Sequence, residues 1–158
     1  MRENCPVSER IRIDEQSPSV YKSQVGVAFA AKQAAKRAGL DRHLVELVNV
    51  RLSQLNGCAR CLDVHTRAAR EAGETEQRLH VLAAWREADL YTEQERAALT
   101  LAEAVTTLPP HDEQERAYAA AREHLDDDQF AAVAWIAIAI NAFNRISIVS
   151  GHEVHARE

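Results

Sequence analysis

The sequence predicts a single all-α domain with essentially no β-sheet. Ala, Glu and Arg are abundant, whereas the 158 residues include only 5 Gly and 4 Pro. Apolar residues recur at the helical period of 3.6, and capping residues precede several of these segments. A chain of this length suits one domain with its own core. We expect about seven helices within residues 19–150, an extended arm at 1–18 and a loosely ordered tail at 151–158.

The first half of the chain predicts three helices. A face of mostly small apolar residues begins after Ser19, a suitable N-cap, and stops at Gly39. Asp41 caps the second helix, which continues to Gly57. The third helix follows directly and ends at Gly73. The second and third helices therefore meet at Gly57.

Three further helices are expected between residues 79 and 125. A short amphipathic segment covers 79–88, with Trp85 in the core. The capping box Thr92-Glu93-Gln94-Glu95 opens the next helix, which Pro109-Pro110 ends. A charged helix with a thin apolar stripe then covers 112–125.

The last predicted helix is apolar nearly all round. Asp126, Asp127 and Asp128 lie at its start, where the helix dipole favours acids. The apolar part, Phe130 to Phe143, is shorter than the ~20 residues of a membrane span. We expect this helix to be buried in the core or between subunits of an oligomer, and we expect Trp135 to lie in the core.

Charge and cysteine content exclude some function classes. The net charge is −5, and no run of Lys or Arg indicates a nucleic-acid partner. No apolar segment follows a basic start, so we expect a cytoplasmic protein without a secretory signal or a membrane partner. In a reducing compartment, a Cys-x-x-Cys pair is typical of catalysis or metal binding. Cys5 lies in the arm, and we interpret it as a bystander thiol.

Cys58, Cys61 and His65 form the segment with the clearest chemical pattern. On a helix, Cys61 lies about 60° and His65 about 20° from Cys58 around the axis, so the three side chains share one face. Gly57 suits the end of the preceding helix and places Cys58 near a helix N-terminus. The dipole and a nearby imidazole both favour a thiolate, so the spacing indicates redox chemistry.

A thiol peroxidase needs a thiolate that attacks the O–O bond, a base that generates it and a second thiol that resolves the sulfenic acid. Cys58 and Cys61 are close enough on one turn to form a disulfide. A chain reversal at Gly57 would pack the two helices side by side and bring Glu46 to the cysteine–histidine face. The candidate catalytic residues are therefore Cys58, Cys61, His65 and Glu46.

The residues alone leave two questions open. The dipole favours Cys58 as the reactive thiol, whereas His65 lies roughly 6 Å by helix rise from Cys61 and about 10 Å from Cys58. Cys58, Cys61 and His65 are also zinc-ligand types, so a zinc clip or a non-enzymatic redox sensor is the rival hypothesis. A closed zinc site needs a fourth ligand, and one helix face supplies ligands from one side only. The peroxidase hypothesis needs no cofactor.

The same residues resemble a known family. Glu46-Leu47-Val48, the run from Arg51 to Cys58, Cys61 and His65 are together similar to the AhpD-like alkylhydroperoxidase family of the carboxymuconolactone decarboxylase superfamily. The similarity continues through Gly73, the Thr92–Val105 helix and the segment Asn141–Ile146. It therefore covers most of the chain.

The resemblance implies an AhpD-like helical domain, assembly as trimers or hexamers, and reduction of peroxides by an external dithiol. It implies that Glu46 and His65 form a proton relay, that Cys61 becomes the sulfenic acid, and that Cys58 donates a proton and resolves it. Arg60 stands where some members carry a histidine, and the peroxide and the electron donor stay open. A decarboxylase-type enzyme is a further alternative and is less similar, because that branch does not use the cysteine pair.

Overall fold

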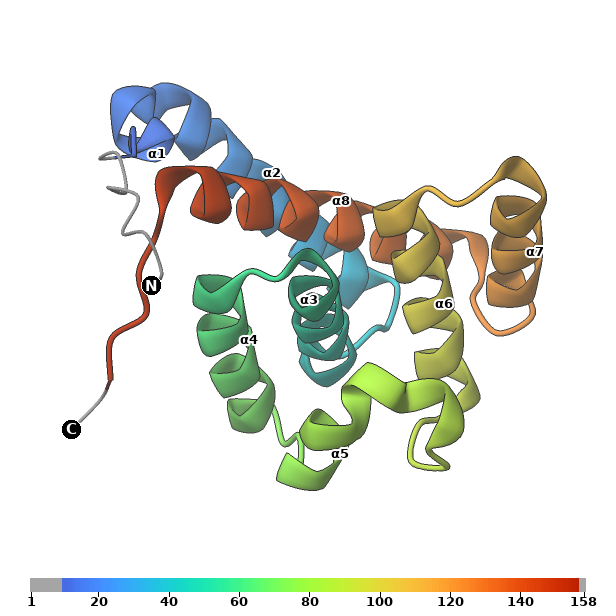
Figure 1. The fold of residues 1–158 in the computed structure, drawn as a ribbon. Helices are drawn as coiled ribbons and strands as arrows, with labels where there is room; N and C mark the ends of the chain where they lie inside the picture. The colour runs from blue at the N-terminus through green and yellow to red at the C-terminus, as the bar shows by residue number, and fades with distance from the viewer. Residues whose placement is uncertain (1–9, 157–158) are drawn as a thin grey trace.

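Nine helical segments and no strand make up residues 10–156, the part of the chain that the computed structural model describes (Figure 1). The all-α class is thus confirmed, with two more segments than expected, because α1 is additional and the 79–88 segment is divided into α5 and η1. The segments are α1 Ile13–Gln16, α2 Pro18–Arg37, α3 Arg42–Asn56, α4 Ala59–Glu71, α5 Glu76–Val81, the 3₁₀ helix η1 Leu82–Glu87, α6 Glu93–Thr107, α7 His111–Arg122 and α8 Asp127–Ser150.

Helix caps explain where several helices begin. The Asp41 side chain accepts the Leu44 N–H at 2.8 Å, as predicted. Thr92 forms the expected capping box at the start of α6, and Asp126 forms another one with Gln129 at the start of α8. Each cap satisfies N–H groups that have no partner within the helix.

The expected extended arm and loose tail are only partly correct. Within the described part of the arm, Ile13–Gln16 are helical, and α2 begins at Pro18 instead of after Ser19. Proline suits a first helical position because its φ is already helical. In the tail, His152 contacts Asp14 at 3.2 Å, so the two ends of the described chain are joined. Cys5 lies outside the described residues.

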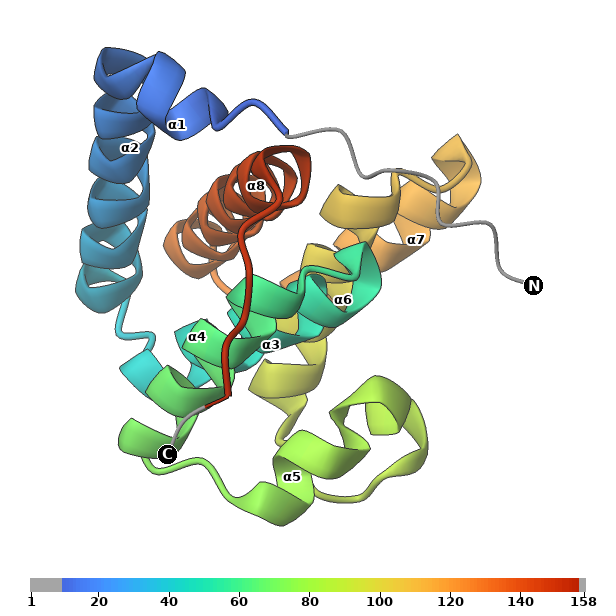
Figure 2. The same cartoon turned by 60° about the vertical axis from the view of Figure 1, so that its left-hand side comes forward.

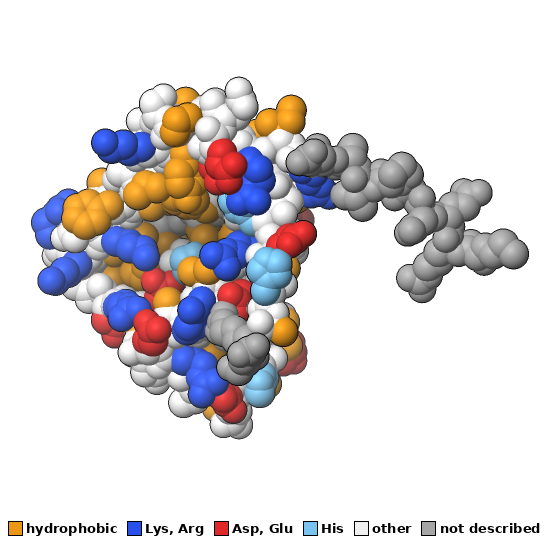
Figure 3. Space-filling view, turned by 90° about the vertical axis from the view of Figure 1, so that its left-hand side faces the viewer, with side chains coloured by type: hydrophobic (Ala, Val, Ile, Leu, Met, Phe, Trp, Pro, Cys, Tyr) orange, Lys and Arg blue, Asp and Glu red, His pale blue; other side chains and the backbone are white. Residues whose placement is uncertain are grey.

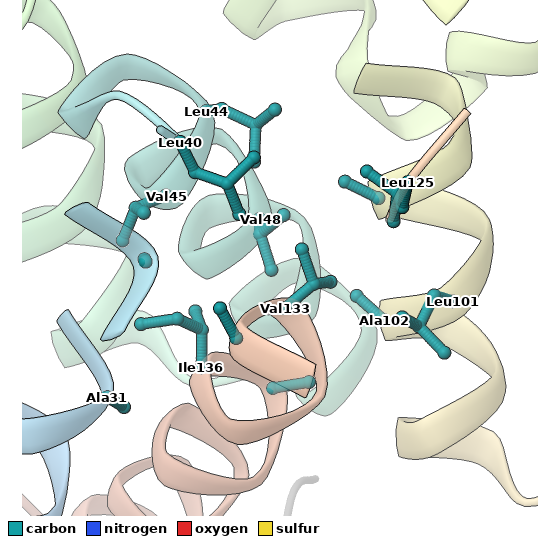
Figure 4. Close-up of a cluster of buried hydrophobic side chains, with 14 of the residues drawn as sticks. Ala31, Leu40, Leu44, Val45, Val48, Leu101, Ala102, Leu125, Val133 and Ile136 are labelled. Atoms are coloured by element: carbon teal, nitrogen blue, oxygen red, sulfur yellow. The ribbon is translucent and has the colours of Figure 1, made fainter. Parts of the chain in front are cut away.

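Helix α8 lies at the centre of the fold and packs against α2, α3 and α6 (Figure 2). The small residues of α2 contribute to this packing, since Ala31 and Ala35 are buried in the same cluster as α8. Figure 4 shows the cluster, in which side chains of α2, α3, α6 and α8 point toward one another. Its labelled members are Ala31, Leu40, Leu44, Val45, Val48, Leu101, Ala102, Leu125, Val133 and Ile136.

Helix α3 is buried on two sides, which decides the position of the candidate site. One side joins the α8 cluster, and Leu47 and Val50 join a second cluster with Leu82, Trp85 and other residues of α4 to α6. The polar residues of α3 between these faces are also nearly inaccessible to water. Buried polar groups need hydrogen-bond partners, so α3 can hold a polar side chain in a defined orientation.

Two expectations about α8 are wrong in detail. It has 24 residues, and it is long and apolar enough to cross a bilayer by length and composition alone. The core helices of water-soluble proteins pass the same test, and this helix is embedded between three others. Trp135 was expected in the core but is 53% exposed, because it lies on the part of α8 that no other described helix covers. Trp85 is buried as predicted.

Candidate active site

The turn between α3 and α4 places the cysteine pair. Gly57 adopts a left-handed conformation (φ 65°), in which glycine has no Cβ penalty. The Cys58 N–H returns to the Ser53 carbonyl at 3.0 Å, and Cys58 then becomes the N-cap of α4. The predicted reversal at Gly57 is therefore present, and α3 and α4 pack side by side.

Three side-chain amides, one of them fully buried, hold this turn against α8. Asn144 is fully buried and donates to the Ser53 hydroxyl at 3.1 Å. Asn56 donates to the side chains of Asn141 and Asn144 at 2.7 and 2.8 Å. Because these bonds link residues far apart in the chain, the turn has little freedom to move relative to α8.

Cys58 and Cys61 form a disulfide, with their Cα atoms 5.3 Å apart. Their environments differ, although both are buried. Cys58 is 1% exposed, and its sulfur accepts the Cys61 N–H at 3.3 Å. Cys61 is 6% exposed and lines a cavity of about 660 Å³, which Cys58 does not line. A solute in the cavity therefore meets Cys61 first.

Glu46 and His65 form a close pair across the α3–α4 interface. The Nδ1 atom of His65 lies 2.6 Å from a carboxylate oxygen of Glu46. Lys32 lies 3.3 Å from the other oxygen, and Asn49 donates to the carboxylate at 3.2 Å. Burial alone would raise the pKa of Glu46, but the hydrogen bond and charge of His65, with Lys32 and Asn49, lower it to about 2. Glu46 is thus a buried, ionised acceptor.

Two cavities meet at His65. The first, the polar chamber, is the cavity that Cys61 lines, and Arg12, Arg60 and the tail residues 151–153 and 155 also line it. The second, the apolar chamber, has about 290 Å³ and lies mainly between α2 and α8. Tyr21, His65 and Phe143 line both, and the two aromatic rings meet edge to face with centroids 6.0 Å apart. Figure 3 shows the hollowed face of the molecule, with hydrophobic side chains and Lys and Arg around the hollow.

The described part of the chain shows no cluster of metal-ligating side chains. Within residues 10–156, no group of three or more His, Cys, Asp and Glu side chains is placed to hold a metal ion. His65, one of the candidate zinc ligands, already has one ring nitrogen against Glu46. The zinc hypothesis therefore gains no fourth ligand from the described part of the chain.

Comparison with known proteins identifies the family. Residues 18–104, more than half of the chain, match the model of the carboxymuconolactone decarboxylase family. The chain belongs to this family. The uncharacterized protein YdfG of Bacillus subtilis (strain 168) is 38% identical over 151 residues, which are 96% of this chain and all of YdfG. The uncharacterized protein YnjA of Escherichia coli (strain K12) is 35% identical over 75 residues, or 48% of this chain and 41% of YnjA.

The crystal structure of a similar protein confirms the AhpD-like fold. It is that of a protein of unknown function from Agrobacterium tumefaciens, provisionally described as the antioxidant defence protein AhpD. The TM-score is 0.81 at 31% identity, with 95% of this chain and all of the other covered. The family assignment and the cysteine pair therefore agree with the resemblance found in the sequence.

The structure brings together all four residues named from the sequence, in two contacts: Cys58 with Cys61, and Glu46 with His65. Sequence reasoning missed the other partners of Glu46. Asn49 could have been found, because i and i+3 are neighbours on a helix. Lys32 on α2 gave no such signal. The sequence also gave no signal that Arg12 and His152, from opposite ends of the described chain, line the polar chamber.

Proposed function

We propose that the chain is a thiol-dependent peroxidase that reduces hydrogen peroxide or organic hydroperoxides through Cys58 and Cys61, at the expense of an external dithiol. The observation that supports it best is a disulfide-forming cysteine pair beside a histidine that a buried, ionised glutamate orients. A carboxylate on one imidazole nitrogen fixes the tautomer and leaves the other nitrogen free to act as a base. We also propose a cytoplasmic location and a homo-oligomer, a trimer or a hexamer.

The proposed oxidation starts at Cys61. His65 Nε2 takes the proton of the Cys61 thiol, because Glu46 holds Nδ1 in its protonated form. The thiolate attacks the terminal oxygen of ROOH, and its electron pair breaks the O–O bond. The products are Cys61–SOH and an alkoxide, which takes the proton from His65 Nε2 and leaves as ROH. Access favours this assignment, since Cys61 lines the polar chamber and Cys58 does not.

Cys58 then resolves the sulfenic acid. Its thiol attacks the Cys61 sulfur, the S–O bond breaks, and the disulfide and one water form. An external dithiol attacks Cys61 from the chamber, and Cys58 leaves as a thiolate. The Cys61 N–H and the N-terminus of α4 stabilise that leaving thiolate. A second thiolate of the donor completes the exchange and returns both cysteines to the reduced form.

Peroxide turnover with a dithiol donor, measured together with the metal content, tests the proposal. We expect catalytic consumption of tert-butyl hydroperoxide or hydrogen peroxide with dithiothreitol, and its loss in Cys61→Ser. Stoichiometric zinc without turnover would support the zinc clip instead. Oxidation of the pair without repeated turnover would support a redox sensor.

A further inference from the structure

We infer that the site is shaped for an organic hydroperoxide that carries a carboxylate close to the peroxide on one side and an apolar chain on the other. This inference rests on the proposed peroxidase function and names its substrate class. The carboxylate would lie near Arg60 in the polar chamber, the O–O bond at Cys61, and the apolar chain in the apolar chamber.

Arg60 supplies the positive charge of this arrangement. It follows the N-cap of α4 by two residues, directly precedes Cys61, and lines the polar chamber. No described residue forms an ion pair or a hydrogen bond with the Arg60 side chain. The other charges of the chamber have partners: Arg12 lies 3.4 Å from Glu15, and Glu153 lies 3.5 Å from His155. Arg60 is therefore the cation left to meet an anionic ligand, and a guanidinium matches a carboxylate in geometry.

The second chamber supplies the apolar half. Side chains of α2 and α8 form most of its wall, including Val25, Ala28, Ile136 and Ile140. Of its polar members, Asn49 and His65 come from α3 and α4, and Lys32 of α2 is paired with Glu46. An alkyl chain in this space would remove apolar wall from water, at about 25 cal/mol for each Å² covered.

The junction of the two chambers is also the reacting position. His65 lines both chambers, whereas Cys61 lines only the polar one. A ligand that spans the junction beside Tyr21 and Phe143 therefore passes the histidine, with its peroxide near Cys61. Hydrogen peroxide would contact neither Arg60 nor the apolar chamber. The arrangement of the two chambers therefore favours a larger substrate.

The test compares one hydroperoxide in charged and neutral form. The probes are the 5-hydroperoxide of eicosatetraenoic acid and its methyl ester, with neutral dithiothreitol as donor. We expect kcat/KM to be about fivefold or more higher for the acid, as a charge-assisted hydrogen bond predicts. In Arg60→Gln this ratio should fall to near one, and in Arg67→Gln, a matched change on the same helix away from both chambers, it should stay at the wild-type value.

The ratio separates recognition from reactivity. Arg60 is adjacent to Cys61, so its charge can also change the acidity of the Cys61 thiol. That effect is the same for the acid and the ester, and it cancels in the ratio of their kcat/KM values. An acid-to-ester ratio near one in the wild type, with tert-butyl hydroperoxide still reduced, would overturn the inference alone. Absence of turnover with every peroxide would overturn the proposed function.

Two further comparisons assign each chamber. Ala28→Leu should raise KM for the 5-hydroperoxide more than for tert-butyl hydroperoxide, while Ala30→Leu, an exposed control on α2, should change neither. Equal effects in the two variants would contradict the apolar half of the inference. If Arg60→Gln slowed turnover with anionic dimercaptosuccinate but left the acid-to-ester ratio intact, Arg60 would bind the electron donor, and the inference would be wrong.

Discussion

Glu46 keeps its charge although its side chain is only 3% exposed. Desolvation opposes this charge, but the hydrogen bonds of His65 and Asn49 and the ammonium group of Lys32 favour it. The pKa of the carboxyl group is therefore lowered to about 2. Its acceptor role toward His65 is preserved over the whole pH range in which a thiol peroxidase works.

The same shift predicts the acid stability of the fold. A pKa lowered from 4.5 to about 2 adds stability that is present above about pH 4.5 and is lost as the pH falls toward 2. The full contribution is on the order of 3 kcal/mol. In urea unfolding at pH 6, 4 and 3, Glu46→Gln should be less stable than the wild type at pH 6, and the difference should shrink as the pH falls.

Glu115→Gln is the matched control, because Glu115 is exposed on α7 and lies beyond the first turn of that helix. Its stability should follow that of the wild type at each pH. A constant difference between Glu46→Gln and the wild type from pH 6 to pH 3 would contradict an ionised, low-pKa Glu46.

The two cysteines should behave differently toward peroxide. Cys58→Ser should accumulate a sulfenic acid at Cys61 that a dimedone-type probe labels, because the resolving thiol is missing. Cys61→Ser should react far more slowly, since Cys58 is buried outside the chamber. Both variants are best made with Cys5→Ser, so that mass spectrometry reports only on the pair. Rapid labelling of Cys58 in Cys61→Ser would reverse the roles and show that the helix dipole outweighs His65.

At the scale of the helices, the α3–α4 hairpin depends on a single left-handed residue. Gly57→Ala should destabilise the fold by about 1 kcal/mol, since an L-residue in this conformation costs about 1–2 kcal/mol. Gly26→Ala provides the opposite control: Gly26 lies within α2, nothing lies within 4 Å of an added Cβ, and alanine should stabilise the helix by up to about 1 kcal/mol.

Chemical denaturation of the two variants checks this pair. Equal shifts of the midpoint for both would mean that the conformation of Gly57 does not limit stability. Turnover of Gly57→Ala should fall as well, because the turn also places Cys58.

Local signals were enough to predict most helix ends and the hairpin. Asp41, Thr92 and Gly57 act through neighbours three or four residues away, which a sequence displays directly. The Glu46–His65 contact could also be predicted, because it follows from the helical periodicity of the two segments and from the chain reversal at Gly57 between them. Local signals failed where a segment depends on a distant one. Ile13 donates its N–H to the Ser150 hydroxyl and Asp14 contacts His152, and the sequence displays neither contact.

At the scale of the whole molecule, apolar side chains remain uncovered on α2 and α8. They include Val20, Val27, Phe29, Trp135 and Ile138, each at least 40% exposed. The sequence could not separate core from surface here, because α8 is apolar on every side and only the packing of α2, α3 and α6 decides which side is covered. A large exposed apolar area is typical of an interface.

We therefore expect sedimentation at micromolar concentration to give a mass above the 17.6 kDa of one chain. Trp135→Ser should lower the sedimentation coefficient, since a large aromatic side chain often dominates an interface. Leu108→Asn is the control: Leu108 is 69% exposed with φ 46°, and asparagine tolerates that conformation. A monomeric wild type, or equal effects of both changes, would contradict an interface at α8.

The four candidate catalytic residues lie within positions 46–65, on one helical hairpin. The walls of the two chambers come largely from elsewhere: α2, α8 and both chain ends. Arg60 and Val64 are the exceptions, because they line the polar chamber from the hairpin itself. Evolution can alter the other walls, and with them what reaches the sulfur, without changing the four catalytic candidates. For protein engineering, the hairpin is the part to keep constant, and α2 together with the tail after Gly151 is the part to randomise when a new oxidant is wanted.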